Sequence, residues 1–435
     1  MTEDQTTATT GQSAGPRLSR RGLLGAAGVG ALAVGGAAGF KIASASETTP
    51  VVVDVSSAPV AFEGAYQAGI VTPAQDRLHL AVFDMTSESR ADLISLLKDW
   101  TLAARKLVQG NEIGVYGAVA GSQFAPPEDT GEALGLPAAA LTLTIGFGPS
   151  LFEDADGKAR FGLEGQKPER LKDLPGFSGD RLDEAISRGD IAIQACANDP
   201  QIAVHAIRNL ARIAFGRASV KYSQLGFGRT SSTSTAQVTP RNLFGFKDGT
   251  ANIKVEEKKD VDAWVWVHKD DGPAWLVGGS YLVTRKIQMR IETWDREPLG
   301  GQNDIIGRQK GSGGPNSGGD EFEPLDFKAK GPDGELLIPE KSHVRLAHPD
   351  FNKGTKLLRR GYNFVDGSDG LGQLSAGLFF ISYQRNPEQF ITIQKSLAGM
   401  TNDVMNEYIV HVSSGLFACP PGLGPKGFWG DGLFA

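Results

Sequence analysis

The sequence predicts an α+β protein built of two similar units, and three observations lead to this fold class. Segments with the two-residue hydrophobic period of strands alternate with segments that have the period of helices. One strand–helix segment occurs twice, at a constant offset of 187 residues. The chain has 435 residues, 40% hydrophobic and 22% charged, which is an ordinary soluble composition and enough length for one large or two medium domains.

Strand and helix patterns alternate through the first unit. Residues 77–85 alternate like a strand, and residues 89–110 place their apolar side chains on one helical face. Residues 140–148 and 190–199 again have strand patterns, and residues 200–215 have a helical pattern with proline in the first turn. The order strand, helix, strand, strand, helix is typical of the split βαβ arrangement of ferredoxin-like folds.

The second unit repeats part of this order. Residues 279–295 form a strand that runs into a helix, residues 377–384 a strand, and residues 386–399 a helix. The constant offset favours an internal duplication over chance similarity, and it relates Pro200 to Pro387, Leu210 to Leu397 and Ala211 to Ala398. We therefore expect two ferredoxin-like units, residues 46–225 and 226–435, packed sheet against sheet in a dimer-like α+β barrel.

The N-terminus has the pattern of an export signal. Arg20 and Arg21 precede a mildly apolar run, and the small residues 43–45 offer a cleavage site. The alternative is a membrane anchor, but seven glycines between residues 22 and 39 lower hydrophobicity and helix propensity. We expect residues 1–45 to be a twin-arginine signal. The mature chain would then be extracellular, periplasmic or on the cell surface, without an integral membrane span.

Composition and motifs exclude several classes of function. The net charge of −6 argues against a nucleic-acid-binding protein, which normally has a basic face. The chain has no zinc-hydrolase histidine spacing, no nucleophile elbow, no Walker loop and no C-x-x-C-H site for covalent haem. Cys196 and Cys419 are far apart in the sequence and are either a disulfide or two small buried residues.

Three segments contain side chains that suggest chemistry. "NLFGFKDGTANI", residues 242–253, places Asp248 in an aromatic frame, although Asp-Gly is also a common turn signal. "KSHVRLAHPD", residues 341–350, holds His343, either a solvated loop histidine or a ligand for haem iron. "LLRRGYN", residues 357–363, brings Arg359 out of an apolar stretch, where burial requires an anionic partner.

Together these segments resemble the dye-decolorising peroxidases, a haem family built on two ferredoxin-like halves. The resemblance rests on "GFKDG" (245–249), "SHVRLAHP" (342–349) and "LLRRGYN" (357–363), in that order, and on the loop "IGRQKGSG" (306–313). It covers about residues 55–430 of this chain. With the leader, it is closest to the secreted branch that includes the iron-uptake-associated, deferrochelatase-like members.

The resemblance implies a function and a set of site residues. The expected cofactor is non-covalent haem b, and the expected reaction reduces hydrogen peroxide through a ferryl intermediate while oxidising bulky organic donors such as dyes. The implied site residues are Asp248 for proton transfer, Arg359 (or its neighbour Arg360) as cation, His343 as iron ligand, Glu407 as acceptor for the His343 ring N–H, Gly249, Thr250 and Ala251 along the haem, and His348 near a propionate. The alternative function is haem binding or release of iron from haem. A homo-oligomer is possible.

Overall fold

The computed structural model describes residues 57–399 and 402–435. The predicted export signal, residues 1–45, lies outside this part of the chain. Within the described residues, no helix has the length and apolar character needed to cross a membrane. The bulk of the chain, from residue 57 onward, belongs to one compact unit.

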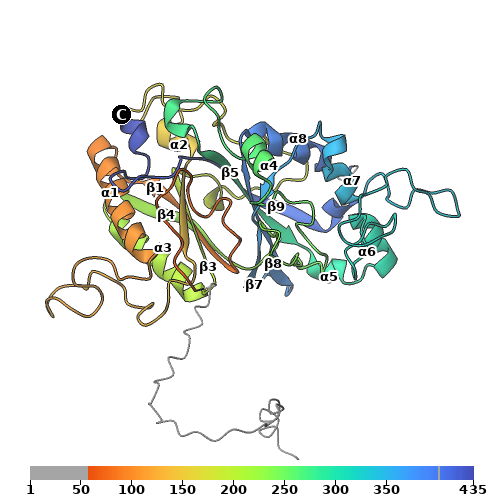
Figure 1. Ribbon diagram of the computed structural model, residues 1–435, viewed down its shortest axis with the longest axis horizontal. Helices are drawn as coiled ribbons and strands as arrows, with labels where there is room; N and C mark the ends of the chain where they lie inside the picture. The colour runs from red at the N-terminus through yellow and green to blue at the C-terminus, as the bar shows by residue number, and fades with distance from the viewer. Residues whose placement is uncertain (1–56, 400–401) are drawn as a thin grey trace, which may run out of the picture. The chain divides into compact units, whose positions relative to one another are not determined.

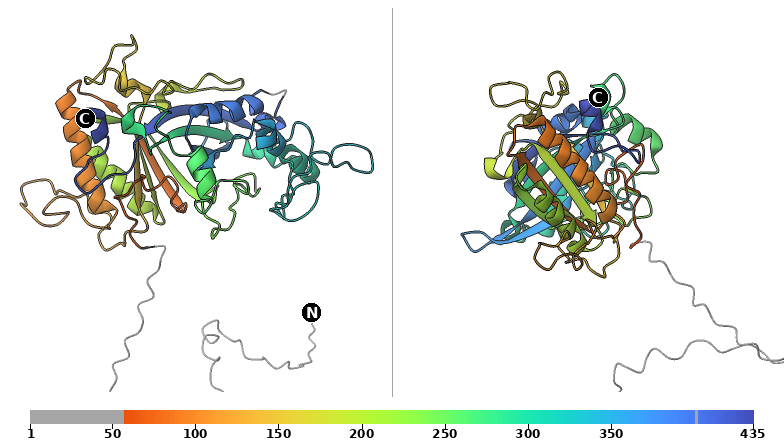
Figure 2. Two further views of the ribbon diagram at one scale, coloured as in Figure 1. Left: turned by 45° about the horizontal axis from the view of Figure 1, so that its top comes forward. Right: turned by 90° about the vertical axis from the view of Figure 1, so that its left-hand side faces the viewer.

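The first half folds as a ferredoxin-like unit, as predicted. Its four strands form an antiparallel sheet in the order β2-β3-β1-β4. They are β1 (Arg77–Met85), β2 (Thr142–Phe147), β3 (Ile191–Ala197) and β4 (Ala218–Arg229). The helices α1 (Arg90–Leu107) and α3 (Pro200–Ala214) pack together over one face of this sheet (Figures 1 and 2). No strand was predicted at the position of β4, and this strand runs past the predicted boundary at residue 225.

The second half has the same strand order. β9 (Ile409–Cys419), β5 (Ser280–Met289), β8 (Leu374–Gln384) and β7 (Tyr362–Ser368) lie side by side, and the two-residue strand β6 (Leu358–Arg359) also pairs with β8. The helix α8 (Pro387–Leu397) connects β8 to β9. It begins at a capping box, in which Asn386 and Gln389 exchange side-chain and backbone hydrogen bonds.

The two sheets meet at their edges and close into a barrel. β2 pairs with β9 at Phe147 and Ala418, and β4 pairs with β7 at Phe227 and Asn363, so each seam joins unlike positions of the two units. Side chains from both sheets fill the interior of this barrel, among them Leu78, Leu80, Val82, Leu282, Phe379, Ile381, Tyr383 and Phe417. The expected dimer-like barrel is therefore present, with short edge pairing in addition to face-to-face packing.

The remaining helices are short and belong to the connections. They are α2 (Pro149–Phe152), α4 (Lys258–Trp264), α5 (Ile291–Trp294), α6 (Leu299–Ile306) and α7 (His343–Ala347). The long segment 297–340 contains α6 and two isolated β-bridges, and otherwise consists of turns and irregular backbone. A separate apolar cluster around the buried Trp294 includes Phe244, Phe246 and Tyr408, and it anchors the loop that carries Asp248.

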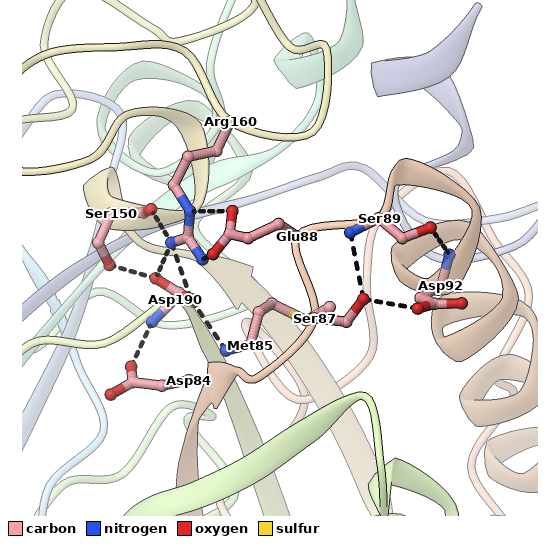
Figure 3. A network of polar contacts seen from close by, with 9 residues as sticks. All are labelled: Asp84, Met85, Ser87, Glu88, Ser89, Asp92, Ser150, Arg160 and Asp190. Atoms are coloured by element: carbon pink, nitrogen blue, oxygen red, sulfur yellow. Dashed lines mark hydrogen bonds and ion pairs between the residues drawn. The ribbon is translucent and has the colours of Figure 1, made fainter.

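A buried ion pair ties the connections of the first unit to its sheet. Arg160 donates to both carboxylate oxygens of Asp190, each at 3.1 Å, and also pairs with Glu88 (Figure 3). The same Asp190 carboxylate accepts from Met85 N–H at 2.9 Å and from the Ser150 hydroxyl at 2.5 Å. The end of β1, the start of α2 and the residue preceding β3 are thereby held together.

Candidate active site

A cavity lies between the second sheet and the helices α7 and α8, and it collects all three segments that the sequence singled out. Asp248, His343 and Arg359 line it, although the chain separates the first and last of them by 111 residues. The rest of its wall is mostly apolar and includes Phe244, Phe246, Ile287, Met289, Ile306, Leu325, Val344, Leu357, Leu378, Phe380, Phe390, Ile393 and Leu397.

Asp248 and Arg359 form an ion pair in this cavity. Arg359 Nη1 donates to Asp248 Oδ1 at 2.7 Å, and Asn242 Nδ2 donates to Asp248 Oδ2 at 3.3 Å. The following Gly249 has φ +92°, and a Cβ there would lie 2.9 Å from Ser231 Cα. Only glycine fits such a turn without strain. The Asp-Gly turn therefore does serve to aim the carboxylate at the arginine.

The structure distinguishes the two neighbouring arginines. Arg359 lies at the end of β6 and faces the cavity, with its side chain 30% exposed. Arg360 is fully buried and points away from the cavity wall, where it donates to the carbonyl of Thr72 and to the side-chain oxygen of Gln75. Arg359 is therefore the arginine available to a ligand in the cavity.

His343 is the first residue of α7 and has a carboxylate partner. Its Nδ1 lies 2.7 Å from Asp403 Oδ2, and Asp403 is 1% exposed. Burial alone lowers the pKa of His343, but the charge and hydrogen bond of Asp403 outweigh burial, so its pKa lies above the ordinary value. Because Nδ1 is engaged, Nε2 is the nitrogen that remains for a ligand in the cavity.

The prediction that Glu407 accepts the His343 N–H is wrong. Glu407 is exposed, and its backbone carbonyl accepts a hydrogen bond from Arg290. The two carboxylates are four residues apart, at opposite ends of a single short 3-10 turn. Asp403 precedes that turn and accepts from Met405 N–H at 2.9 Å, which points its carboxylate inward.

The other predicted residues also reach the cavity wall. Gly249, Thr250, Ala251 and His348 all line it. Burial, together with the charge of Arg308, lowers the pKa of His348, although Asp350 acts in the opposite direction. Arg308 itself lines the cavity, is 7% exposed, and donates to the carbonyls of Gly313 and Glu321 at 2.8 Å.

These residues fit a haem better than a bare metal ion. A flat apolar macrocycle requires apolar walls, an imidazole for the iron, and cations for its carboxylates, and the cavity offers His343, Arg308 and an aromatic and aliphatic lining. Among residues 57–399 and 402–435, no three His, Cys, Asp or Glu side chains are grouped to hold a metal ion. The fold and the cavity thus define a haem protein of the α+β barrel class.

Comparison with known proteins identifies the family within this class. Residues 67–228 match the N-terminal domain and residues 239–423 the C-terminal domain of Dyp-type peroxidases. The chain belongs to the Dyp-type peroxidase family, whose members are haem peroxidases. The family resemblance seen in the sequence is confirmed.

Relatives and solved structures agree with this assignment. The chain is 37% identical to a deferrochelatase of Shigella sonnei over 93% of this chain and 94% of that protein, and 38% identical to one of Yersinia pestis over 83% and 81%. Ferric DtpA from Streptomyces lividans has a TM-score of 0.77 at 37% identity and covers 87% of this chain and 98% of its own. A DyP-type peroxidase from Cellulomonas bogoriensis has a TM-score of 0.76 at 35% identity, with the same coverage.

Sequence reasoning missed two residues of the cavity. The sequence "TNDVMNE" contains a pattern that could have indicated Asp403, because an aspartate before a short helical turn is a common N-cap. Arg308 lies in the loop "IGRQKGSG", which was noted without a role for any of its side chains. For Asp403 the local pattern is insufficient, because its partner His343 lies 60 residues away in the sequence.

Proposed function

We propose that this protein is a haem b peroxidase that reduces hydrogen peroxide and oxidises organic donors, including bulky dyes. The observation that supports the proposal is the Asp248–Arg359 ion pair, which lines the same cavity as the carboxylate-bound His343. A haem carrier needs the histidine and the apolar walls, but it has no need of an acid–cation pair held at 2.7 Å.

Each side chain has a distinct role in the proposed reaction. His343 Nε2 would hold the haem, and Asp403 keeps the His343 ring in one orientation with its Nδ1–H donated. When bound, haem supplies the iron on which the peroxide O–O bond is split. The carboxylate of Asp248 would take the proton from the inner peroxide oxygen and return it to the outer one, which leaves as water. The guanidinium of Arg359 remains charged and would stabilise negative charge on the peroxide.

The test compares Asp248→Asn with the parent protein. The amide keeps the shape of the side chain but cannot accept the proton, so we expect the reaction with peroxide to slow by roughly 10²- to 10⁴-fold. Haem affinity should stay the same, because His343 and Asp403 are unchanged. Stopped-flow absorbance after mixing with one equivalent of peroxide measures the first quantity, and titration of the apoprotein with haem measures the second. Equal peroxide rates in the two proteins would remove Asp248 from the mechanism.

Release of iron from haem is a second candidate function. It is favoured by the relatives named deferrochelatase, which are 37% identical over 93% of this chain. The two functions differ in their products, since iron release leaves a metal-free porphyrin and the peroxidase reaction leaves the haem intact. Porphyrin fluorescence after incubation of the haem-loaded protein under reducing conditions distinguishes them. A stoichiometric rise in fluorescence supports iron release.

We further propose export through the twin-arginine route, on the basis of Arg20 and Arg21 and the apolar run that follows them. Replacing both arginines by lysine keeps the charge but removes the recognised pair. We expect the double variant Arg20→Lys/Arg21→Lys to remain inside the cell at full length. Cell fractionation and the mass of the mature N-terminus measure the outcome, and secretion of both proteins at equal levels would contradict the proposal.

A further inference from the structure

The cavity places Asp248 and Arg359 in contact although they come from separate segments of the chain. Asp248 belongs to an irregular loop after β4, and Arg359 ends the two-residue strand β6. A long guanidinium side chain has many rotamers, and one ion pair between partly exposed side chains gives only a modest preference for one of them. Their relative position therefore depends on how the two backbones are held.

The amide of Asn252 joins the two backbones directly. Its Oδ1 accepts from Arg359 N–H at 2.7 Å, and its Nδ2 donates to Arg359 C=O at 2.9 Å. The amide thus binds Arg359 on both sides, as a neighbouring strand would. Nδ2 also donates to the carbonyl of Ser232 at 3.1 Å, and Asn252 is only 5% exposed.

The ammonium of Lys254 holds the same loop from a second direction. Its Nζ donates to Ser232 C=O at 2.8 Å, to Ser232 Oγ at 2.7 Å and to Gly249 C=O at 3.3 Å. Lys254 is 7% exposed, which is rare for a lysine unless its charge is used. Gly249, the residue after Asp248, is thereby tied to the Ser231–Ser232 segment that its backbone already approaches closely.

We propose that Asn252 and Lys254 are positioning residues that set the distance and orientation between Asp248 and Arg359. Every side-chain hydrogen bond that Asn252 makes goes to Arg359 or to Ser232, and Lys254 binds Ser232 and Gly249. The inference rests on the proposed function, in which the acid and the cation act on one bound peroxide. It assigns the geometry of that pair to two residues that do not line the cavity.

The first test uses the apoprotein and does not depend on activity. In Asn252→Ala, the N–H of Arg359 loses its acceptor, so its hydrogen exchange should speed up by about tenfold. The N–H of Arg360 is the internal control, because it donates to Ile381 C=O at 2.8 Å and keeps that partner. Residue-resolved hydrogen exchange measures both. Equal acceleration at both amides, or none at Arg359, would contradict the proposed clamp.

The second test uses the haem-loaded protein and a double-mutant cycle. A displacement of about 1 Å in a reacting pair costs up to about 10²-fold in rate, so Asn252→Ala should slow the reaction with peroxide by roughly 10- to 100-fold. In the Asp248→Asn background, the same substitution should have almost no further effect, because the pair that it positions is already disabled. Slowing by the same factor in both backgrounds would overturn the proposal and leave Asn252 with a general structural role.

Two further variants keep the test decisive. Asn209→Ala is the matched control, since Asn209 is also a buried asparagine, in α3, whose Nδ2 donates to His205 C=O at 3.1 Å and to Thr130 Oγ1 at 2.9 Å. It should lose similar stability with no change in the peroxide rate. If Asn252→Ala does not fold, Lys254→Met takes its place and should slow the peroxide reaction in the same Asp248-dependent way.

The two proposals can fail separately. If Asp248→Asn reacts with peroxide as fast as the parent protein, the acid role in the proposed function is lost. The exchange rates of the Arg359 and Arg360 amides in the apoprotein still decide whether Asn252 holds Arg359.

Discussion

The contact between His343 and Asp403 gives a prediction at the scale of single residues. Asp403→Asn keeps an oxygen that can accept from Met405 N–H. The substitution removes one of the two acceptor oxygens, and it also removes the negative charge that raises the pKa of His343. Under the proposed role of His343 as haem ligand, we expect haem affinity to fall by about 10- to 100-fold. Titration of the apoprotein with haem measures the change.

Glu407→Gln is the matched control for this prediction. This substitution neutralises the carboxylate that we predicted from the sequence as the partner of His343. Glu407 belongs to the same 3-10 turn that follows Asp403, but it has no contact with the His343 ring. Haem affinity should therefore be unchanged in Glu407→Gln. An equal loss in both variants would mean that the charge of the turn, and not the hydrogen bond, controls the affinity.

Site residues were predictable from the sequence where each lies in a short segment with a recognisable local pattern. Asp248, His343 and Arg359 each lie in a short segment with its own signature, and all three line one cavity. Asp403 and Asn252 were not predictable in this way. Their roles arise from partners 60 and 107 residues away, and an isolated aspartate or asparagine has the same appearance in a turn.

The ion pair between Arg160 and Asp190 gives a prediction at the scale of elements (Figure 3). In Asp190→Asn, the guanidinium of Arg160, which is 14% exposed, loses its buried partner, and Met85 N–H and the Ser150 hydroxyl lose charge-assisted bonds. We expect the free energy of unfolding to fall by about 3–5 kcal/mol. Glu88→Gln, at the 73% exposed end of the same network, should cost less than about 1 kcal/mol. Chemical denaturation measures the free energy of unfolding of both variants. Similar decreases in the two variants would contradict the conclusion that the buried Asp190, and not the exposed Glu88, is the stabilising partner of Arg160.

Elements were predictable where the hydrophobic period was regular. β1 occupies residues 77–85 as expected, and α1, α3 and α8 lie inside the predicted helical segments. β4 was missed because exposed polar residues and two glycines interrupt its pattern, "ASVKYSQLGFGR". β7 and β9 were also missed. β9 is almost entirely buried, and its buried polar residues His411, Ser413 and Ser414 interrupt the continuous apolar run that would indicate a buried strand.

At the scale of the whole molecule, duplication was predictable but barrel closure was not. The fixed offset between the two strand–helix segments showed that two units exist. The closure depends on very few residue pairs at the seams, such as Phe147 with Ala418, and these leave no local signal. The consequence is a shared interior in which side chains of both units are buried together. We therefore expect the two halves to unfold in a single cooperative transition.

One partly buried and one buried histidine, His79 and His411, make the free energy of unfolding depend on pH. Burial lowers the pKa of His79 to about 4, and burial with the charge of Arg285 lowers that of His411 to about 3. In the unfolded chain both titrate near pH ~6.5. Between about pH 6.5 and 4.5 the unfolded chain therefore binds more protons than the folded one, and the free energy of unfolding falls as the pH falls. The contribution of His343 to the pH dependence has the opposite sign, because its pKa is raised in the folded state. It adds stability below about pH 6.5, and this stability is lost as the pH rises through the pKa of the folded state.

His79→Gln isolates one of these contributions away from the cavity. His79 lies in β1 on the face that carries Phe83 toward the helices, and its Nδ1 is buried without a hydrogen-bond partner. Because His79 keeps some exposure, its share of the stability lost between neutral pH and about pH 4.5 is roughly 2 kcal/mol. Chemical denaturation of the apoprotein at both pH values should show a smaller difference for His79→Gln than for the parent, by that amount. An identical difference in the two proteins would mean that His79 is protonated equally in the folded and unfolded states, and the acid sensitivity of the barrel would then have to come from His411 and the other buried groups.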